Sequence, residues 1–182
     1  MAAGADTLLI YGFLIALGLL YSNMLEWVLH KKLHDWGKNK KSIWAFHWRD
    51  HHKRPRQHQM VDTHATRREV AGLALLAGIH LPLWWISPVF FSTLLYGLSN
   101  YYVTHKLCHK NKEWAEWSKT HCPWHYDHHM GPDQNANWCV TKPWFDHIMG
   151  TRKYYYGTPL YHKHQKLKDR YIRKKQGIKN HT

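Results

Sequence analysis

Two long stretches of the sequence, residues 1–30 and 69–105, contain no lysine or arginine. The chain has 26 of these basic residues, and all of them fall in residues 31–68 or 106–179. Apolar stretches bordered by basic segments are typical of membrane proteins, whose basic loops stay on the cytoplasmic side. The sequence therefore predicts an all-α integral membrane protein with two basic cytoplasmic regions.

The formal net charge of +14 arises from these two basic regions. Strongly basic proteins often bind nucleic acid. Basic segments beside apolar spans, however, are explained by the positive-inside rule and by attraction to anionic lipid headgroups. We therefore expect the membrane, and no nucleic acid, to be the partner of the basic regions.

Residues 7–28 form the first predicted membrane helix, since about 22 residues at 1.5 Å each cover about 33 Å. A cleaved signal peptide is the competing interpretation, but no basic segment precedes the apolar run. Residues 70–103 form a second apolar block, which Pro82 and Pro88 divide into two short halves. We predict a transmembrane hairpin there, giving about three spans. The alternative is one span plus a re-entrant hairpin that enters one leaflet.

The charge pattern also predicts the orientation of the chain in the membrane. The first helix is expected to enter the cytoplasm near His30, and the hairpin to return there near His105. The membrane is expected to be a bacterial inner membrane or the endoplasmic reticulum, with the functional site on its cytoplasmic side. Residues 1–161 are predicted to form one membrane domain with a cytoplasmic helical cap, and residues 162–182 a basic tail.

Ten of the eighteen histidines lie in four tight clusters. Histidines four positions apart lie on one face of a helix. Two of the clusters follow the predicted spans, so both reach the same membrane face. Ten imidazoles suit two metal ions, and imidazole favours Fe, Zn, Cu or Ni over Mg or Ca. The predicted ligands are His30 and His34; His47, His51 and His52; His105 and His109; and His125, His128 and His129.

Two of these clusters contain adjacent histidines, His51–His52 and His128–His129. Neighbouring side chains on a helix point about 100° apart, so each pair either serves two ions or braces both sides of one site. A histidine-rich surface or metal-storage tract is the alternative. Such tracts are usually of low complexity, whereas tryptophan-rich sequence separates the clusters here.

The order of the boxes, HxxxH, HxxxHH, HxxxH and HxxHH, resembles that of the fatty acid hydroxylase/sterol desaturase superfamily. Residues 128–152, HHMGPDQNANWCVTKPWFDHIMGTR, resemble the segment that follows the last histidines of that family. The resemblance covers residues 30–157 and implies a non-haem di-iron centre held by the ten histidines. It also implies an O2-dependent oxidoreductase acting on a lipid C–H bond, with hydroxylation of a fatty acyl chain as the leading interpretation.

The sequence departs from the pattern of this superfamily in two respects. Members commonly have four membrane helices, whereas three are expected here. Some members carry a fused cytochrome b5 domain that is not recognisable in this sequence, so electrons are expected from a separate donor of the cytochrome b5 or ferredoxin type.

The substrate and the function class have alternatives. Residues 26–35 also resemble the carotenoid hydroxylase branch, so carotenoid or sterol hydroxylation or desaturation is an alternative activity. A metal-binding or metal-transport membrane protein is the alternative from another class. The same ligands can hold zinc in purified protein.

Four residues near the boxes are candidates for supporting the ligands. Glu26, one turn before His30, is expected to accept the hydrogen of the second ring nitrogen of that histidine. The alternative is an interfacial acid whose side chain reaches water. Asp50 and Asp127 are further candidate acceptors, with surface salt bridges as the alternative. Asn137 either contacts the site or forms a turn.

Other chemically active residues are expected to lie outside the metal site. Asp146 is predicted to pin the loop before Gly150, and His80 to be buried and hydrogen-bonded. Cys108 is predicted to pack rather than to bind metal, and all three cysteines to be reduced thiols. His121 lies four residues before His125, but Pro123 between them breaks the helical continuity. His147 has no partner histidine at a helical spacing, and we expect neither of the two to be a ligand. The histidines predicted on the surface are His58, His64, His162, His164 and His181.

Overall fold

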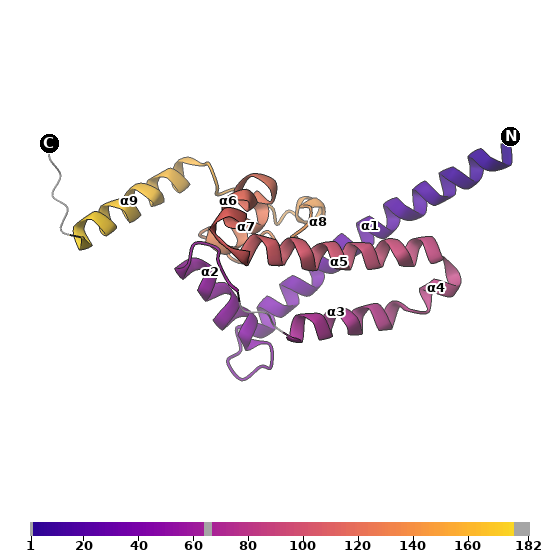
Figure 1. The fold of residues 1–182 in the computed structure, drawn as a ribbon, viewed down its shortest axis with the longest axis horizontal. Coiled ribbons are helices and arrows are strands. Elements are labelled where there is room, and N and C mark those ends of the chain that lie inside the picture. Colours follow the sequence, from indigo (N-terminus) through magenta and orange to yellow (C-terminus); the bar gives the residue numbers. More distant parts are fainter. Residues whose placement is uncertain (1, 64–66, 177–182) are drawn as a thin grey trace.

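The computed structural model describes residues 2–63 and 67–176, which form helices and loops without any strand (Figure 1). The prediction of an all-α fold is therefore confirmed for this part of the chain. The predicted surface histidines His64 and His181 lie outside it. The elements are α1 (Ala2–Gly37), the short π-helix η1 (His47–His52), α2 (Lys53–Gln57), α3 (Arg67–His80), α4 (Leu83–Ile86), α5 (Pro88–Lys110), α6 (Lys112–His121), α7 (Pro123–Met130), α8 (Trp144–Ile148) and α9 (Pro159–Lys175).

Helix α1 carries both the first predicted span and the first histidine box without a break. Its segment Gly4–Gly37 is the one helix of the described residues that is long and apolar enough to cross a membrane. Large apolar side chains on its N-terminal half, including Leu8, Leu9 and Phe13, are exposed. Water does not solvate such a surface favourably, so the environment that suits it is lipid.

The second apolar block forms the predicted helical hairpin, α3–α4–α5. Pro82 precedes α4 and Pro88 begins α5, because proline is accepted in the first turn of a helix but not within it. The Ser87 hydroxyl caps α5 by accepting a hydrogen bond from the Phe90 amide at 3.2 Å. The hairpin shape is as predicted, whereas its passage across a membrane stays a prediction.

Helices α1 and α5 pack closely against each other over much of their length. Two glycines lie at this contact, Gly18 against Thr93 and Gly97 against Ser22. A Cβ atom on Gly97 would collide with the Ser22 side chain. This close approach brings the C-terminal ends of the two helices together, and those ends carry the first and third histidine boxes.

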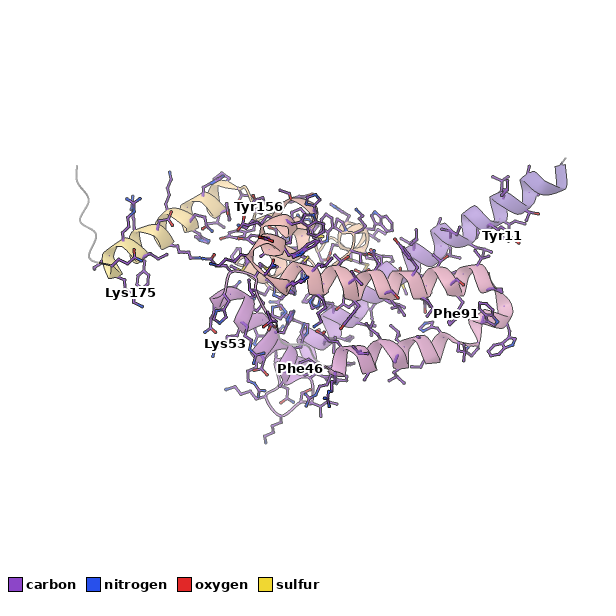
Figure 2. The ribbon with its side chains drawn as sticks, viewed as in Figure 1. Tyr11, Phe46, Lys53, Phe91, Tyr156 and Lys175 are labelled. Atoms are coloured by element: carbon purple, nitrogen blue, oxygen red, sulfur yellow. The ribbon has the colours of Figure 1, made fainter. Side chains whose placement is uncertain are left out.

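The end of the molecule that holds the hairpin tip carries no lysine or arginine (Figure 2). Tyr11 and Phe91 lie toward the end formed by the hairpin tip and the start of α1, where Trp85 and Ile86 of α4 are exposed. Lys53, the first residue of α2, and Lys175, the last residue of α9, lie toward the other end. The basic C-terminal segment forms α9, which extends from this end and has no buried residue.

Candidate metal centre

The four histidine boxes meet between α1, η1, α5 and α7. Helix α1 provides two of the histidines, η1 three, α5 two and α7 three. All ten side chains are buried, with relative exposures between 0% and 8%. The structure therefore brings together every histidine that the sequence singled out as a ligand.

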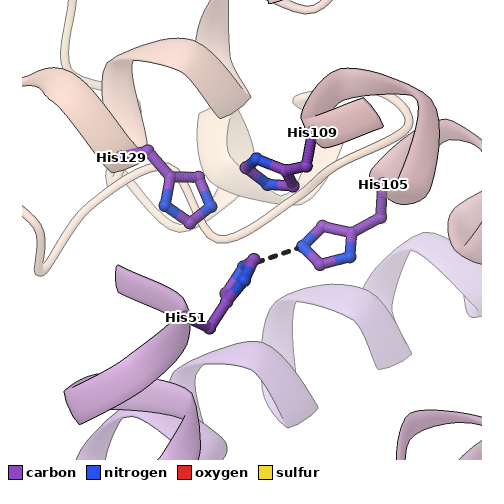
Figure 3. A group of neighbouring side chains, drawn as sticks. All are labelled: His51, His105, His109 and His129. Carbon is purple, nitrogen blue, oxygen red and sulfur yellow. Dashed lines mark hydrogen bonds between the residues drawn. The ribbon is translucent and has the colours of Figure 1, made fainter. Parts of the chain in front are cut away.

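The ten imidazoles form two adjoining groups. Cluster A contains His51, His105, His109 and His129, whose ligand nitrogens lie within 4.8 Å of one another (Figure 3). It also includes His125, whose Nε2 lies 3.0 Å from Nε2 of His109. Cluster B combines two overlapping groups of the same compactness, formed by His30, His34, His47, His52 and His128.

The adjacent histidines divide between the clusters. His51 and His129 belong to cluster A, whereas His52 and His128 belong to cluster B. The rings of His52 and His129 are stacked with their centroids 4.7 Å apart, so the two clusters are neighbours. Of the two interpretations of the histidine doublets, this division favours two separate ions.

Ring nitrogens face one another at distances that suit shared coordination. The Nε2 atoms are separated by 3.1 Å in the pair His51–His105 and by 3.3 Å in His52–His128. Two imidazole nitrogens that each lie about 2.1 Å from one metal ion are separated by about 2.9–3.4 Å, depending on the coordination angle. The observed spacing is the one that a common metal ion would impose.

Backbone carbonyls fix the tautomers of three rings. Nδ1 of His30, His109 and His128 lies 2.6–2.7 Å from the carbonyl oxygens of Trp138, Met60 and Ala136, respectively. A carbonyl can only accept, so each Nδ1 carries the proton and donates it. The Nε2 lone pair of these rings is therefore free to bind a metal ion, an arrangement that is common around metal-bound histidine.

Several buried ring nitrogens have no hydrogen-bond partner among the described residues. They include Nε2 of His30 and His47 and both ring nitrogens of His34 and His129. A buried polar atom without a partner costs about 1–3 kcal/mol. A bound cation would satisfy the lone pairs, so the donor set fits metal ions held by imidazole.

Burial also keeps these rings neutral. The pKa values of His47, His52, His125, His128 and His129 are all well below the ordinary range, chiefly because burial penalises the charged form and secondarily because neighbouring imidazoles repel it. Neutral imidazole is the form that binds a metal ion.

Glu26 does not have the role predicted for it. Its carboxylate accepts hydrogen bonds from the amides of Val140 and Thr141 at 2.9 and 3.0 Å, and the carbonyl of Trp138 takes the predicted place beside His30. The prediction failed because residues 131–142 fold back over α1, and the helical spacing of Glu26 and His30 gives no sign of this loop. Glu26 supports His30 indirectly, by fixing the loop that provides the carbonyl.

The other three predicted supporting residues also have no hydrogen bond to the boxes. Asp50 pairs with Arg49 at the surface at 3.0 Å, which is the predicted alternative. Asp127 pairs with Arg152 at 2.8 Å in a buried rather than a surface salt bridge. Asn137 adopts a left-handed conformation, with φ of 60°, and its side chain bonds both backbone groups of Lys153. Asparagine tolerates this conformation well. Asn137 links the loop before α8 to the segment after it, so it neither contacts the site nor forms the predicted turn.

Two supporting residues were not predicted from the sequence. Asp62 Oδ2 lies 3.2 Å from Nδ1 of His51, and the Gln134 side chain lies 3.3 Å from Nδ1 of His52. Both come from loops without helical or strand periodicity. The one feature of the sequence that could have pointed to Asp62 is that it is the single acidic residue between Lys53 and Arg68.

Asp146 and Cys108 lie outside the clusters, as predicted. Asp146 accepts hydrogen bonds from the amides of Trp138 and Cys139 at 2.8 and 2.9 Å. These bonds fix the loop between α7 and α8. Cys108 packs in a buried group with Met60 and Cys122, and all three cysteines are free thiols.

The remaining described histidines also lie outside the clusters. His58, His121, His147 and His162 are exposed. His80 is half-buried rather than buried, and its Nε2 bonds the Tyr21 hydroxyl at 2.9 Å. His164, predicted on the surface, is half-buried and lies 3.0 Å from the Tyr155 hydroxyl.

These features define a class: a helical protein with a long apolar helix and ten buried histidines arranged to hold metal ions. The family model described as fatty acid hydroxylase matches residues 15–151, a range that includes all four boxes. The chain belongs to this family, and thereby to the fatty acid hydroxylase/sterol desaturase superfamily. No curated protein and no solved structure matched the chain.

Proposed function

We propose that this protein is a membrane di-iron oxygenase that hydroxylates a C–H bond of a lipid, with a fatty acyl chain as the preferred substrate class. The observation that carries the proposal is the pair of buried imidazole clusters at the joined ends of α1 and α5. The balanced reaction is O2 + RH + 2 e− + 2 H+ → ROH + H2O, where RH is the lipid. A separate donor supplies the electrons.

The arrangement of the helices supports a lipid substrate. In the proposed topology α1, α3 and α5 cross the membrane, and η1, α2 and α6–α8 form a cytoplasmic cap over the histidines. The apolar side chains of α1 and of the hairpin then face acyl chains along the length of both elements. A lipid that enters between these helices has its chain directed toward the clusters without leaving an apolar environment.

The metal pair, when bound, supplies redox chemistry with O2 that no side chain provides. The protein's own residues set its geometry. The carbonyls of Met60, Ala136 and Trp138 hold three rings in the Nδ1-protonated tautomer, and Asp62 orients His51. Burial of all ten imidazoles excludes bulk water, which limits side reactions at the site.

Imidazole-rich ligation does not by itself select iron. Iron is proposed because the family oxidises substrates, and zinc has no redox chemistry. Purified protein can nevertheless carry zinc in the same clusters. Metal analysis and activity are therefore measured on the same samples.

The test compares the lipids of a host with and without the protein by mass spectrometry. Hydroxylation adds 16 mass units to a lipid and desaturation removes 2, so the experiment also separates the two activities of the superfamily. His128→Ala removes one ligand of cluster B and is expected to lower product formation by at least about 100-fold, with loss of iron. His121→Ala is the matched control, because His121 is exposed and stacks on Trp117 outside both clusters.

The proposal is wrong if cells with iron, O2 and the wild-type protein show unaltered lipids while His128→Ala behaves like the wild type. Metal uptake into the same cells is measured in parallel. Faster uptake without any change in lipids would favour the transport alternative.

A further inference from the structure

We propose that a basic depression beside Asp62 is the docking surface for an acidic one-electron carrier protein, and that electrons reach cluster A through the contact between Asp62 and His51. This inference rests on the proposed function, because only an oxidase or oxygenase reaction consumes electrons here. It goes beyond that function by assigning a surface and the kind of partner that the surface fits.

The basic depression lies where the segment after α2 meets the junction of α5 and α6. It has a volume of about 850 Å3, and its lining includes Arg54, His58, Asp62, Lys110 and Lys112. A second hollow of about 350 Å3 shares Arg54 and Asp62 with it and adds Arg67 and His51. Asp62 therefore belongs to both hollows.

Asp62 connects this surface to the histidines. Its carboxylate lies 3.2 Å from Nδ1 of His51. Nε2 of His51 in turn lies 3.1 Å from Nε2 of His105 (Figure 3). Its backbone amide also donates to the carbonyl of His109 at 2.9 Å. His51 is the most exposed of the ten histidines, at 8%. A short bonded route thus leads from the floor of the depression into cluster A.

The charge of the depression fits an acidic partner. Lys110 and Lys112 are exposed, whereas Arg54, the third cation, lies 3.9 Å from Asp62, the one acidic side chain in the same lining. The excess positive charge therefore comes from the two lysines. Complementary charge steers association and mainly changes the rate of encounter and its dependence on salt. An acidic carrier would therefore bind more tightly at low ionic strength.

The position of the depression favours a protein partner over a lipid headgroup. The end of α2 and the start of α6 lie at the end of the molecule opposite the hairpin tip, α4 (Figure 1). In the proposed topology this end faces the cytosol, where a soluble carrier can approach it. The reduced carrier is oxidised by one electron in each encounter. Two such encounters supply the two electrons of the reaction, and water supplies the two protons. The other two electrons that reduce O2 come from the lipid.

The test replaces the two exposed lysines, Lys110→Glu and Lys112→Glu, in one variant. The matched control, Lys163→Glu with Lys166→Glu, makes the same change in net charge on α9, outside the basic depression. The probes are two acidic carriers, a [2Fe–2S] ferredoxin and the soluble domain of a cytochrome b5. Binding to the full-length, metal-free protein in detergent is measured at low and at high salt, so this readout does not depend on activity.

We expect the Lys110/Lys112 variant to bind at least one carrier about tenfold more weakly than the wild type at low salt, with the difference shrinking at high salt. The α9 control is expected to bind like the wild type. In iron-loaded protein, product formation with that carrier falls in the Lys110/Lys112 variant, whereas product formation with dithionite does not.

Two results would overturn the inference. In one, neither carrier binds the wild type more tightly than the Lys110/Lys112 variant. In the other, the α9 control weakens binding equally, which shows that only net charge matters. If the iron-loaded wild type forms no product even with dithionite, the proposed function fails instead, and the binding data on metal-free protein still decide where a carrier docks.

Discussion

The histidine rings are oriented by groups that lie far from them in the chain. His30 donates its Nδ1 proton to the carbonyl of Trp138, and His109 donates to that of Met60. Each bond selects one tautomer and leaves Nε2 as the nitrogen that can bind a metal ion. Because backbone carbonyls do this work, the sequence contains no side-chain pattern from which these contacts could be predicted.

Asp62 is the side-chain counterpart of these carbonyls, and replacing it should weaken metal binding. Asp62→Asn keeps the size of the side chain but removes the carboxylate beside Nδ1 of His51. Loss of such a supporting group typically lowers metal affinity by 10- to 100-fold. We expect a loss of about 10-fold in cluster A, measured by competition with a chelator of known affinity. Asp50→Asn is the control, since Asp50 pairs with Arg49 at the surface, and equal affinities for the two variants would contradict the prediction.

At the scale of the elements, the loop between α7 and α8 is held against α1 by a row of polar side chains. Asn23 donates to the carbonyl of Lys142, and Glu26 accepts from Val140 and Thr141. Trp27 donates to Thr151, just after α8, and so ties the next segment to α1 as well. Polar side chains on a long apolar helix would be costly if they faced lipid. Here they are satisfied by the loop, so α1 is apolar toward its start and polar where the cap covers it.

The Glu26→Ala variant should uncouple this loop from α1. Two amides and the hydroxyl of Thr141 lose their acceptor, and buried donors left without partners cost about 1–3 kcal/mol each. We expect the free energy of unfolding in detergent to fall by about 2–4 kcal/mol, with a lower metal content because the loop also holds His30. Glu116→Ala is the control, because Glu116 is exposed on α6 and forms a surface pair with Lys119. A Glu26→Ala protein as stable as this control would show that the loop is held by other contacts.

The elements also explain which parts of the site could be predicted from the sequence. His30 with His34 and His105 with His109 extend the C-terminal ends of two parallel helices, so their spacing and the charge pattern together predicted that they meet. The histidine doublets in η1 and α7 were predicted as ligands from the number of histidines and from their spacing. The contacts of Glu26, Asp62 and Gln134 could not be predicted, because they depend on loops that fold back over the helices. Such loops have no periodic pattern that relates sequence to position.

At the scale of the whole molecule, the depth of the hairpin decides how the histidines are presented to lipid. A hairpin that crosses the membrane places α4 on the far side, opposite the histidine clusters. A re-entrant hairpin leaves α4 within one leaflet. Trp84, Trp85 and Ile86 at the tip are exposed, and both arrangements would give them an apolar or interfacial environment.

Single added cysteines distinguish these arrangements, because Cys108, Cys122 and Cys139 are all buried and should react slowly. In intact, sealed cells of a bacterial host, Ser87→Cys at the hairpin tip is expected to react with a membrane-impermeant maleimide added outside. Lys112→Cys is expected to react only after the membrane is opened. The first result follows if α3 and α5 both cross, since the tip then reaches external water, and the second if α6 lies in the cytoplasmic cap. If Ser87→Cys does not react with the maleimide either before or after the membrane is opened, the hairpin tip lies inside the bilayer. External labelling of both positions would put the tip and α6 on the same side and rule out the proposed topology.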